Sequence, residues 1–199
     1  KATDTFFLKG ENEEIYEPHF TFHGFQYVEA TGLSSKPEPS SITGCAIYSQ
    51  SPVAGNFECS SSMVNKLYSN ICWGQRGNFI SIPTDCPQRD ERLGWMGDAQ
   101  IFVRTATYNR DAAAFFTKWM QDVEDAQSEE GAYADTSPRL KDIPNFEAVA
   151  AWADAGIIIP WTIWRVYGDT RIIERHWASM ERWMNFMLKT NPDFLRKNR

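Results

Sequence analysis

The sequence predicts a mainly helical chain that opens with the last strands of a β-sandwich. Residues 18–57 contain short aromatic and β-branched runs separated by turn-forming residues, a pattern typical of strands. From about residue 59 the apolar residues recur every three to four positions, which is the period of an amphipathic helix. We therefore expect residues 1–58 to form the end of a sandwich and a linker, and residues 59–199 to form the first helices of a larger helical array.

The expected strands are short. The first lies in residues 20–28, where four aromatic residues are interrupted by Gly24. Residues 33–41 are a loop by composition, because Ser, Pro and charged residues dominate there. Two further strands are expected at residues 45–48 and near residues 56–57.

The first three helices are each expected to bury one apolar face. The first begins at a Ser60 or Ser61 cap and ends before Gly77. The second spans residues 97–108, and the third starts from an Asp111 cap. The inward residues expected for the first and third helices are Val64, Leu67, Tyr68, Ile71, Phe115, Phe116, Trp119, Met120 and Val123.

A polar loop at residues 127–146 is expected before the last two helices. The fourth helix is strongly apolar and leads to Gly168, with a kink or a restart at Pro160. The last helix is capped by Asp169 or Thr170. Its apolar stripe is expected to belong to the core rather than to a binding site, and consists of Ile173, Trp177, Met180, Met184 and Met187.

Charge and composition exclude several classes of function. The net charge is -6 and the Lys and Arg residues are scattered, so no nucleic-acid partner is expected. The longest nearly apolar run, residues 155–164, is about half of the roughly 20 residues that a membrane span needs, so no membrane partner is expected either. Aromatic residues make up 14% of the chain and suit either a thick core or a sugar-stacking surface.

The cysteines and the chain start bear on the compartment. The four cysteines form no C-x-x-C pair, and the chain has only 3 His, which argues against structural zinc. Such spacing could give disulfides in a secreted protein, but a chain of this size can bury a core without them. We expect buried thiols at Cys45, Cys59, Cys72 and Cys86. The start at Lys1 shows no leader pattern, so we expect part of a longer protein and lean toward a cytoplasmic location.

The chemistry is expected in residues 82–98. Arg89, Arg92 and four carboxylates lie there between Pro and Gly residues, the carboxylates being Asp85, Asp90, Glu91 and Asp98. By residue type this segment is either an ion-paired surface loop or a site where one carboxyl donates a proton and another stays ionised. Trp95 either covers a sugar ring or simply packs.

Other chemistries have weaker support. Asp85, Asp90 and Glu91 could ligate calcium, but the two arginines argue against it, so we expect no metal. The chain has no nucleotide-binding, zinc-protease or serine-hydrolase motif, so we expect no cofactor. The three histidines are isolated in sequence and are expected to be structural: His19, His23 and His176.

The run Pro83-Thr-Asp-Cys-Pro-Gln-Arg-Asp-Glu-Arg-Leu-Gly-Trp95, followed by Gly97-Asp98, closely resembles the signature of the bacterial α-L-rhamnosidases of glycoside hydrolase family 78. The resemblance extends to four further segments, so it covers nearly the whole chain: residues 19–29, 73–78, 152–155 and 167–169. Met96 departs from the family pattern, which often has a small polar residue there. The resemblance implies an (α/α)6 barrel preceded by β-sandwich domains, and hydrolysis of terminal α-L-rhamnose with inversion.

The resemblance also implies a role for each matching residue. Glu91 is implied as the general acid. The residues implied to contact the sugar are Asp85, Arg89 and Asp98 at its hydroxyls, Trp95 as an aromatic wall, and Trp152 and Asp154, more weakly, at the rim. Inversion needs a second carboxylate about 6.5–9.5 Å away. The family takes this base from a later part of the barrel, and we assign it to no residue of this sequence.

Two alternatives stay open beside this reading. The first is a glycosidase of another sugar specificity on the same barrel. The second is an inactive carbohydrate-binding fragment, whose uncovered apolar helix faces would favour association, for example as a homo-oligomer. The expected partner is a rhamnose-containing glycoside or polysaccharide.

Overall fold

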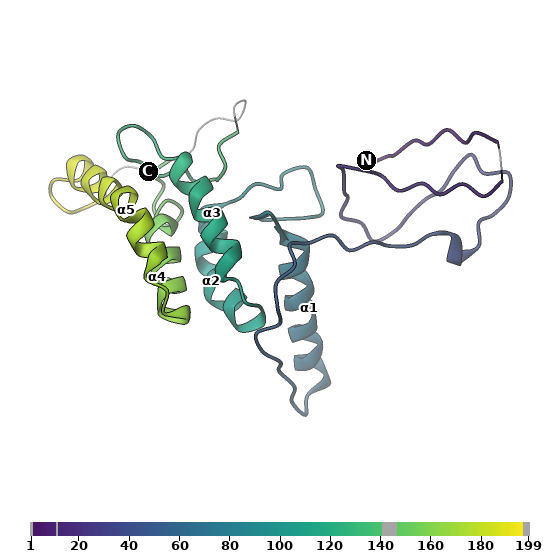
Figure 1. Ribbon diagram of the computed structural model, residues 1–199, viewed down its shortest axis with the longest axis horizontal. Helices are drawn as coiled ribbons and strands as arrows, with labels where there is room; N and C mark the ends of the chain where they lie inside the picture. The colour runs from purple at the N-terminus through teal and green to yellow at the C-terminus, as the bar shows by residue number, and fades with distance from the viewer. Residues whose placement is uncertain (1, 11, 141–146, 197–199) are drawn as a thin grey trace.

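The structure is a computed structural model that describes residues 2–10, 12–140 and 147–196. Five α-helices account for most of its regular structure (Figure 1). Their bounds are α1 Ser62–Asn78, α2 Met96–Asn109, α3 Ala113–Asp125, α4 Ala155–Tyr167 and α5 Arg171–Thr190. A short 3-10 helix, η1, spans Pro39–Ser41, and two strands, β1 Phe79–Ile80 and β2 Ile82–Pro83, follow α1. The expectation of a mainly helical chain is confirmed.

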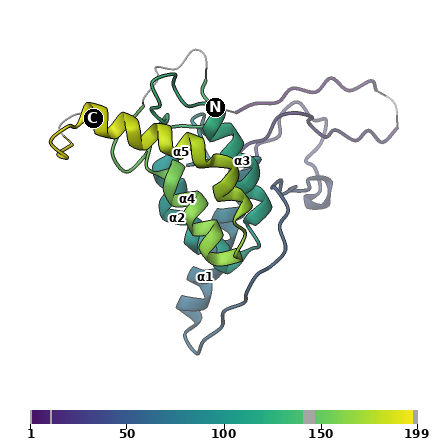
Figure 2. The same ribbon diagram turned by 60° about the vertical axis from the view of Figure 1, so that its left-hand side comes forward.

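Helices α2, α3, α4 and α5 form the packed part of the molecule. Helix α4 contacts α2, α3 and α5, while α3 also contacts α5. Helix α1 lies beside α2, to which its buried Gln75 is hydrogen-bonded through the Ala106 carbonyl and Asn109. The N-terminal region extends to the other side of α1 (Figures 1 and 2). The packed part contains the apolar core, in which Phe79 stacks on Phe115 with ring centroids 4.3 Å apart and Phe116 packs edge-on to both.

Helix α3 shows why these helices form where they do. Its five buried residues share one face and are the five expected from the sequence: Phe115, Phe116, Trp119, Met120 and Val123. The expected Asp111 cap is displaced by one residue: Ala112 is the N-cap of α3, and the Asp111 carboxylate accepts a hydrogen bond from the Ala113 amide at 3.2 Å just before it. The expected Ser61 cap of α1 is present, with Val64 N donating to Ser61 Oγ at 3.4 Å. Helix α4 passes through Pro160 without a restart and ends at Gly168, whose φ of 70° suits glycine.

The strands expected before residue 59 are not formed. Among described residues 2–10 and 12–58, the only regular element is η1, and Val53 makes an isolated bridge with Arg110. The segments at 20–28, 45–48 and 56–57 therefore contain no strand within the described residues. A strand requires a neighbour for its backbone groups, and within the described residues these runs do not pair with one another. Their aromatic side chains are correspondingly exposed, Phe20 fully and Tyr27 by 89%.

Two of the expected buried faces also differ from the structure. On α1, Val64 and Leu67 are exposed, and Gln75 is the one buried residue. On α5 the buried face is turned by about one residue from the expected stripe, so Trp177 and Met184 are exposed. The residues that α5 does bury are Ile172, His176, Ser179, Met180 and Trp183.

The expectation of four buried thiols is wrong for three of them. Cys86 is buried, Cys59 and Cys72 are half-buried, and Cys45 is exposed. Cys45 lies in the N-terminal region, where no described residue before Gln75 is buried. All four thiols are free.

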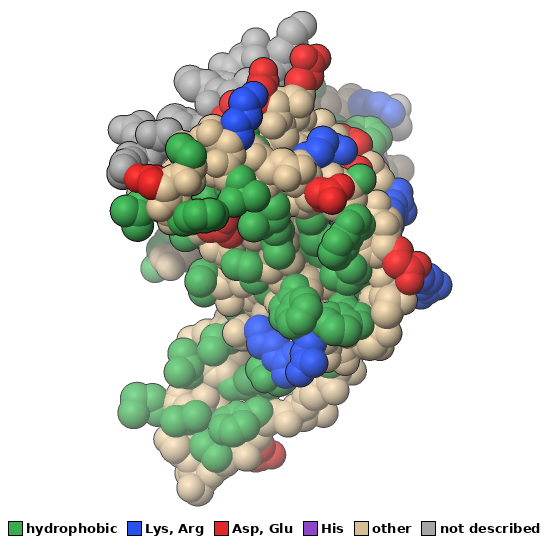
Figure 3. All heavy atoms as spheres, turned by 90° about the vertical axis from the view of Figure 1, so that its left-hand side faces the viewer, with side chains coloured by type: hydrophobic (Ala, Val, Ile, Leu, Met, Phe, Trp, Pro, Cys, Tyr) green, Lys and Arg blue, Asp and Glu red, His purple; other side chains and the backbone are tan. Residues whose placement is uncertain are grey.

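Apolar side chains gather on the surface of α4 and α5 that faces the viewer in Figure 3. The exposed large apolar residues of these two helices are Ile158, Trp161, Trp177, Met184 and Leu188. No helix within the described part of the chain combines the length and apolar character needed to cross a membrane.

Candidate active site

The acidic segment forms a loop between β2 and α2, at residues 84–95. Its first end is fixed by a tight β-hairpin, in which β1 and β2 pair antiparallel with Ile80 opposite Ile82. Ser81, at the tip, has a φ of 65°. The Thr84 amide then donates to the Asn78 carbonyl at 2.8 Å, so the loop starts at the end of α1.

The second end of the loop is joined to a distant segment, residues 135–137. The Met96 amide donates to the Asp135 carbonyl, and the Ser137 amide donates to the Gly94 carbonyl, each at 2.9 Å. Trp119, in the core, donates from Nε1 to the Ser137 carbonyl at 3.0 Å. A side chain at Gly94 would lie against the Ser137 backbone, so glycine permits this close approach.

Asp85 closes the loop on itself. Its Oδ1 accepts a hydrogen bond from the Leu93 amide at 3.0 Å, and its own amide donates to the Leu93 carbonyl at 3.1 Å. The Asp85 side chain is only 10% exposed. Two hydrogen bonds, one between backbone groups and one to the Asp85 carboxylate, therefore join Asp85 to Leu93, the residues on either side of the stretch that carries Glu91.

Two groups hold the Glu91 carboxylate. Trp95 Nε1 donates to Glu91 Oε1 at 3.0 Å, and Arg89 forms an ion pair with the other oxygen. Arg89 also lies 3.8 Å from Asp85 Oδ2, so one guanidinium bridges two carboxylates. The pKa of Arg89 is raised, first by its hydrogen bond with Cys86 and then by the charge of Glu91. This places Asp85, Arg89, Glu91 and Trp95 in one connected group.

Asp98 lies in the first turn of α2, close to this group. Burial raises its pKa above the ordinary range, and the negative charges of Asp85 and Glu91 raise it further, although a hydrogen bond from its own backbone opposes the shift. Asp98 is therefore the acid of the site that holds its proton more readily than an isolated aspartate.

An open cavity of about 650 Å³ adjoins these carboxylates, between α1 and α2. Asp85, Asp98 and Trp152 lie in its wall. Most of the remaining wall is apolar and comes from α1, the β1–β2 hairpin and α2, including Ile71, Phe79, Ile101 and Phe102. The volume and the apolar walls with a few convergent polar groups are those of a small-ligand site.

Trp152 and Asp154 lie on the turn before α4. A side chain at Gly97 would stand 2.9 Å from the Trp152 ring, so the indole lies directly on the first turn of α2. The Asp154 carboxylate accepts a hydrogen bond from the Ala151 amide at 3.0 Å and shapes this turn. Contacts join Asp85, Arg89, Glu91 and Trp95, and the cavity wall contains Asp85, Asp98 and Trp152. The other four expected residues, Arg89, Glu91, Trp95 and Asp154, are not among the described residues that line the cavity, and Asp154 makes none of these contacts either.

A metal could be held only by part of the set considered from the sequence. Ligand atoms of Asp85, Cys86 and Glu91 all lie within 4.8 Å of one another, whereas Asp90 is not in this group. The guanidinium of Arg89 contacts Glu91 and lies near Asp85, which opposes a cation there.

Asp135 is a residue of this region that the sequence reasoning missed. It lies in the expected polar loop, yet it is 2% exposed. Its Oδ1 accepts from the Val149 amide at 3.0 Å, and burial raises its pKa. The available signal was the compact run of Ala132, Tyr133 and Ala134, which is unusual in a solvated loop and is fully buried here.

The expected structural role of His176 agrees with its surroundings. Its ring is fully buried on α5, and its Nδ1 lies 2.8 Å from Glu124 Oε2 of α3.

The candidate site as a whole contains carboxylates, a guanidinium and two indoles beside an apolar cavity. Such a set can bind hydroxyl groups and supply a proton to an oxygen atom.

Comparison with known proteins gives consistent matches along the chain. Residues 52–199 match the family model of the bacterial alpha-L-rhamnosidase 6 hairpin glycosidase domain, and residues 1–48 match the bacterial alpha-L-rhamnosidase concanavalin-like domain. An alpha-L-rhamnosidase of Streptomyces avermitilis is 48% identical over 195 residues, and one of Formosa agariphila is 40% identical over 197 residues. Each alignment covers 98% of this chain, which spans 19% and 21% of those two proteins.

Two solved structures have the same fold over this length. The Streptomyces avermitilis alpha-L-rhamnosidase complexed with L-rhamnose gives a TM-score of 0.87 at 47% identity, covering 92% of this chain and 18% of that one. The alpha-L-rhamnosidase from Dictyoglumus thermophilum gives a TM-score of 0.87 at 41% identity, covering 92% of this chain and 20% of that one.

Proposed function

Because this chain belongs to the bacterial alpha-L-rhamnosidase family, we propose that the full-length protein releases terminal α-L-rhamnose from glycosides or polysaccharides with inversion, and that Glu91 is its general acid. The observation that carries the proposal is the fixed position of the Glu91 carboxylate, which Trp95 and Arg89 hold in one group with Asp85, whose own side chain lies in the wall of the open cavity.

The proposed reaction is a single displacement. Protonated Glu91 gives its proton to the glycosidic oxygen as the bond from that oxygen to the anomeric carbon breaks. A water molecule attacks the anomeric carbon from the opposite face and loses a proton to a second carboxylate. The resemblance puts that base in a later part of the family's barrel, and we propose no residue of this sequence for it.

The remaining residues would bind and orient the sugar. We assign Asp85, Arg89 and Asp98 to the sugar hydroxyls, and Trp95 to an aromatic wall. A sugar hydroxyl bound by Arg89 would lie beside the Glu91 carboxylate, because the same guanidinium contacts both. Trp152 is proposed at the rim, and Asp154 is proposed to support the turn that carries it.

The domain division is part of the same proposal. We place the end of the sandwich and the linker at residues 1–58 and the catalytic helices at residues 59–199. The family models meet between residues 48 and 52, which supports two units but not this particular boundary.

The test is Glu91→Gln in the full-length protein. We expect hydrolysis of an alkyl α-L-rhamnoside to fall by about 10²–10⁴-fold, because its leaving oxygen needs the proton. Hydrolysis of 4-nitrophenyl α-L-rhamnoside should fall much less, because nitrophenolate leaves without protonation. Asp90→Asn, beside Glu91 and exposed, is the matched control.

Three outcomes would overturn parts of this proposal. Near-normal hydrolysis of the alkyl rhamnoside by Glu91→Gln would remove Glu91 as the acid. Faster cleavage of another 4-nitrophenyl glycoside than of the rhamnoside by the wild type would favour a different sugar specificity. Retention of configuration in the released sugar would exclude the single displacement.

A further inference from the structure

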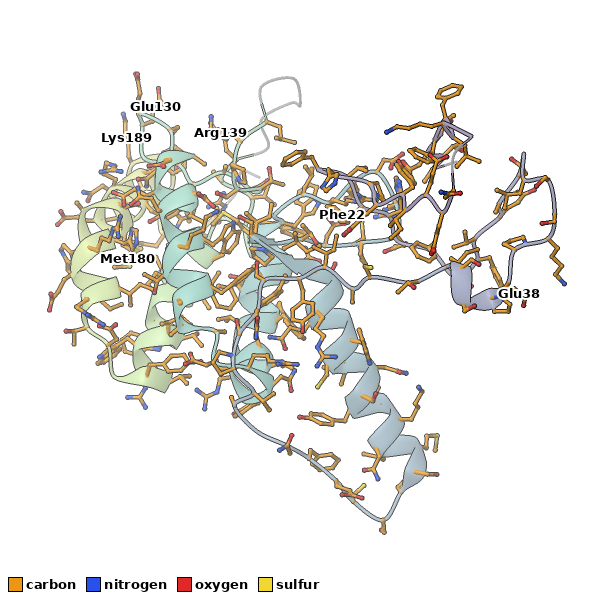
Figure 4. The ribbon with its side chains drawn as sticks, turned by 45° about the vertical axis from the view of Figure 1, so that its right-hand side comes forward. Phe22, Glu38, Glu130, Arg139, Met180 and Lys189 are labelled. Atoms are coloured by element: carbon orange, nitrogen blue, oxygen red, sulfur yellow. The ribbon has the colours of Figure 1, made fainter. Side chains whose placement is uncertain are left out.

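The N-terminal region contacts the Glu91 loop through residues 22–24. Arg92 Nη1 donates to the Phe22 carbonyl at 2.9 Å, across a sequence separation of 70 residues. The Arg92 guanidinium also lies over the Phe22 ring, 4.4 Å from its centroid. Figure 4 shows Phe22 where the N-terminal region approaches the helical part of the molecule. Residues 22–24 are half-buried, whereas the residues on either side of them are exposed.

Gly24 brings the backbone of this segment against the loop. A Cβ atom at Gly24 would stand 2.6 Å from Gln88 Cα and 2.7 Å from the Pro87 carbonyl carbon. Both neighbours are backbone atoms, so no rotamer change could make room. Gly24 does not have a positive φ, unlike Gly10 and Gly32. The glycine is therefore needed for the close approach and not for its backbone angle.

Arg92 transmits this contact toward Glu91. Besides Phe22, it donates from Nε to the Arg89 carbonyl at 3.1 Å. Its own φ of 52° lies in the left-handed region, which costs a non-glycine residue free energy and needs compensating contacts. The same side chain thus holds the peptide of Arg89, which pairs with Glu91, and rests on the N-terminal region.

The two contacts bracket the acid. The Gly24 backbone lies against the backbone of Pro87 and Gln88, which precede Glu91 in sequence. The Phe22 carbonyl accepts a hydrogen bond from Arg92, which follows Glu91. We propose that the segment Phe22–Gly24 is a positioning element for Glu91, so that the region matching the concanavalin-like domain completes the active site of the region matching the glycosidase domain. This proposal rests on Glu91 being the general acid. A displacement of about 1 Å at a catalytic group can cost about 10²-fold in rate, so the contact is close enough to matter.

The experiment compares Gly24→Ala with Gly44→Ala in the full-length protein. Gly44 lies in the same region, has no atom within 4 Å of an added Cβ and no positive φ, so its substitution is the matched control. For each variant, kcat is measured on an alkyl α-L-rhamnoside and on 4-nitrophenyl α-L-rhamnoside. The ratio of the two values does not depend on how much of the sample is folded.

We expect Gly24→Ala to lower kcat on the alkyl rhamnoside by about 10–100-fold and on the nitrophenyl rhamnoside by less than about threefold, because only the former needs proton donation. Gly44→Ala should leave both values unchanged. Arg92→Lys keeps the charge but cannot span Phe22 and Arg89 with a planar fork, so it should change the ratio in the same direction. The Arg92→Lys variant also tests the proposal if the Gly24→Ala variant does not fold.

Equal losses on both substrates in Gly24→Ala and Arg92→Lys would overturn the proposal, since the contact would then be structural only. Unchanged rates in both variants would overturn it as well. Glu91→Gln on the same substrates separates the two hypotheses. If Glu91→Gln changes the ratio and Gly24→Ala does not, only the positioning role fails. If Glu91→Gln leaves the ratio unchanged, the assignment of the acid fails.

Discussion

The helical core and the loop at residues 84–95 meet at Trp95, but different forces hold them. In the core of α2 to α5, rings and aliphatic side chains pack against one another, as around Phe116, which is fully buried. In the loop only Cys86 and Gly94 are buried, and hydrogen bonds and ion pairs hold Asp85 to Leu93 and hold Glu91 to Trp95 and Arg89.

This difference indicates a division of roles. Packing in the core supplies most of the stability, because burial of apolar area is its main source. Contacts between exposed charges contribute little to stability, yet they determine where the carboxylates of the loop lie. Substitutions in the core should therefore change stability, and substitutions in the loop should change the reaction.

The largest expected effect is in the core. Phe116→Ala should lower the free energy of unfolding by about 3–5 kcal/mol, because it leaves a cavity among Phe79, Phe115 and Trp119. The activity of the remaining folded protein should be close to normal. Lys118→Ala, on the exposed side of the same helix, loses an ion pair with Asp122 and should cost below about 1 kcal/mol. Chemical denaturation combined with an activity assay checks this prediction. A Phe116→Ala variant that is folded but inactive would contradict the division of roles between a stabilising core and a catalytic loop.

The next effect is in the loop. Trp95→Phe keeps an aromatic ring but removes the hydrogen bond from Nε1 to Glu91. We expect kcat on an alkyl rhamnoside to fall about tenfold, as the loss of about 1.4 kcal/mol from a hydrogen bond to a charged group would give. Trp161→Phe, at an exposed position of α4, is the control. A large drop in Tm without a change in kcat would assign Trp95 to the core instead.

A smaller effect concerns pH. Since the pKa of Asp98 is raised, the stability it contributes is complete below the ordinary aspartate range and is lost as the pH rises through the raised pKa. At neutral pH, Asp98 therefore destabilises the fold. Asp98→Asn should raise Tm at pH 7 by about 1–2 °C, lose this advantage as the pH falls below the ordinary aspartate range, and raise KM, as thermal unfolding at several pH values and steady-state kinetics would show.

Asp169 is the matched comparison, because it also lies at the start of a helix. Its pKa is lowered to about 2 by hydrogen bonds from Arg171. Its stabilisation is therefore present above the ordinary aspartate range and is lost as the pH falls through about 2. Asp169→Asn should destabilise at pH 7, with a difference that shrinks in acid. The same sign for both variants would contradict the assigned electrostatics.

The smallest perturbation is labelling of the native thiols. Cys45 should react first with a neutral thiol reagent and Cys86 last, because one is exposed and the other buried. Peptide mass mapping over time would give the order, and the denatured protein, in which all four thiols react, is the control. Fast labelling of Cys86 would show that the loop opens readily.

The sequence predicted helices better than it predicted which faces they bury. On α3 the periodic residues are buried because α4 and α5 pack against this helix and cover them. On α5 the Met residues set the expected stripe, but His176 and Ser179 are buried instead, in hydrogen bonds with Glu124 and Tyr133. Hydropathy assigns such polar residues to the surface, so the predicted face was turned.

The sequence pointed to the candidate loop at residues 84–95 but not to the distant segments that contact it. Asp85, Glu91 and Asp98 lie close in sequence, so their grouping follows from one motif. The approach of residues 135–137 and of Phe22 and Gly24 depends on the tertiary fold, which spacing along the chain does not encode. The strands before residue 59 failed for the same reason, because pairing requires a partner that local sequence does not specify.

The joining of residues 94–96 to residues 135–137 also has a consequence during biosynthesis. The two segments are separated by about 40 residues, so the loop can take its final shape only after the ribosome has released the chain well past Ser137. Glu91 would leave the ribosome early, and while α3 is being synthesised its loop would lack the hydrogen bonds to residues 135–137. We therefore expect nascent chains that stop before residue 135 to carry the complete acidic motif and yet lack its geometry.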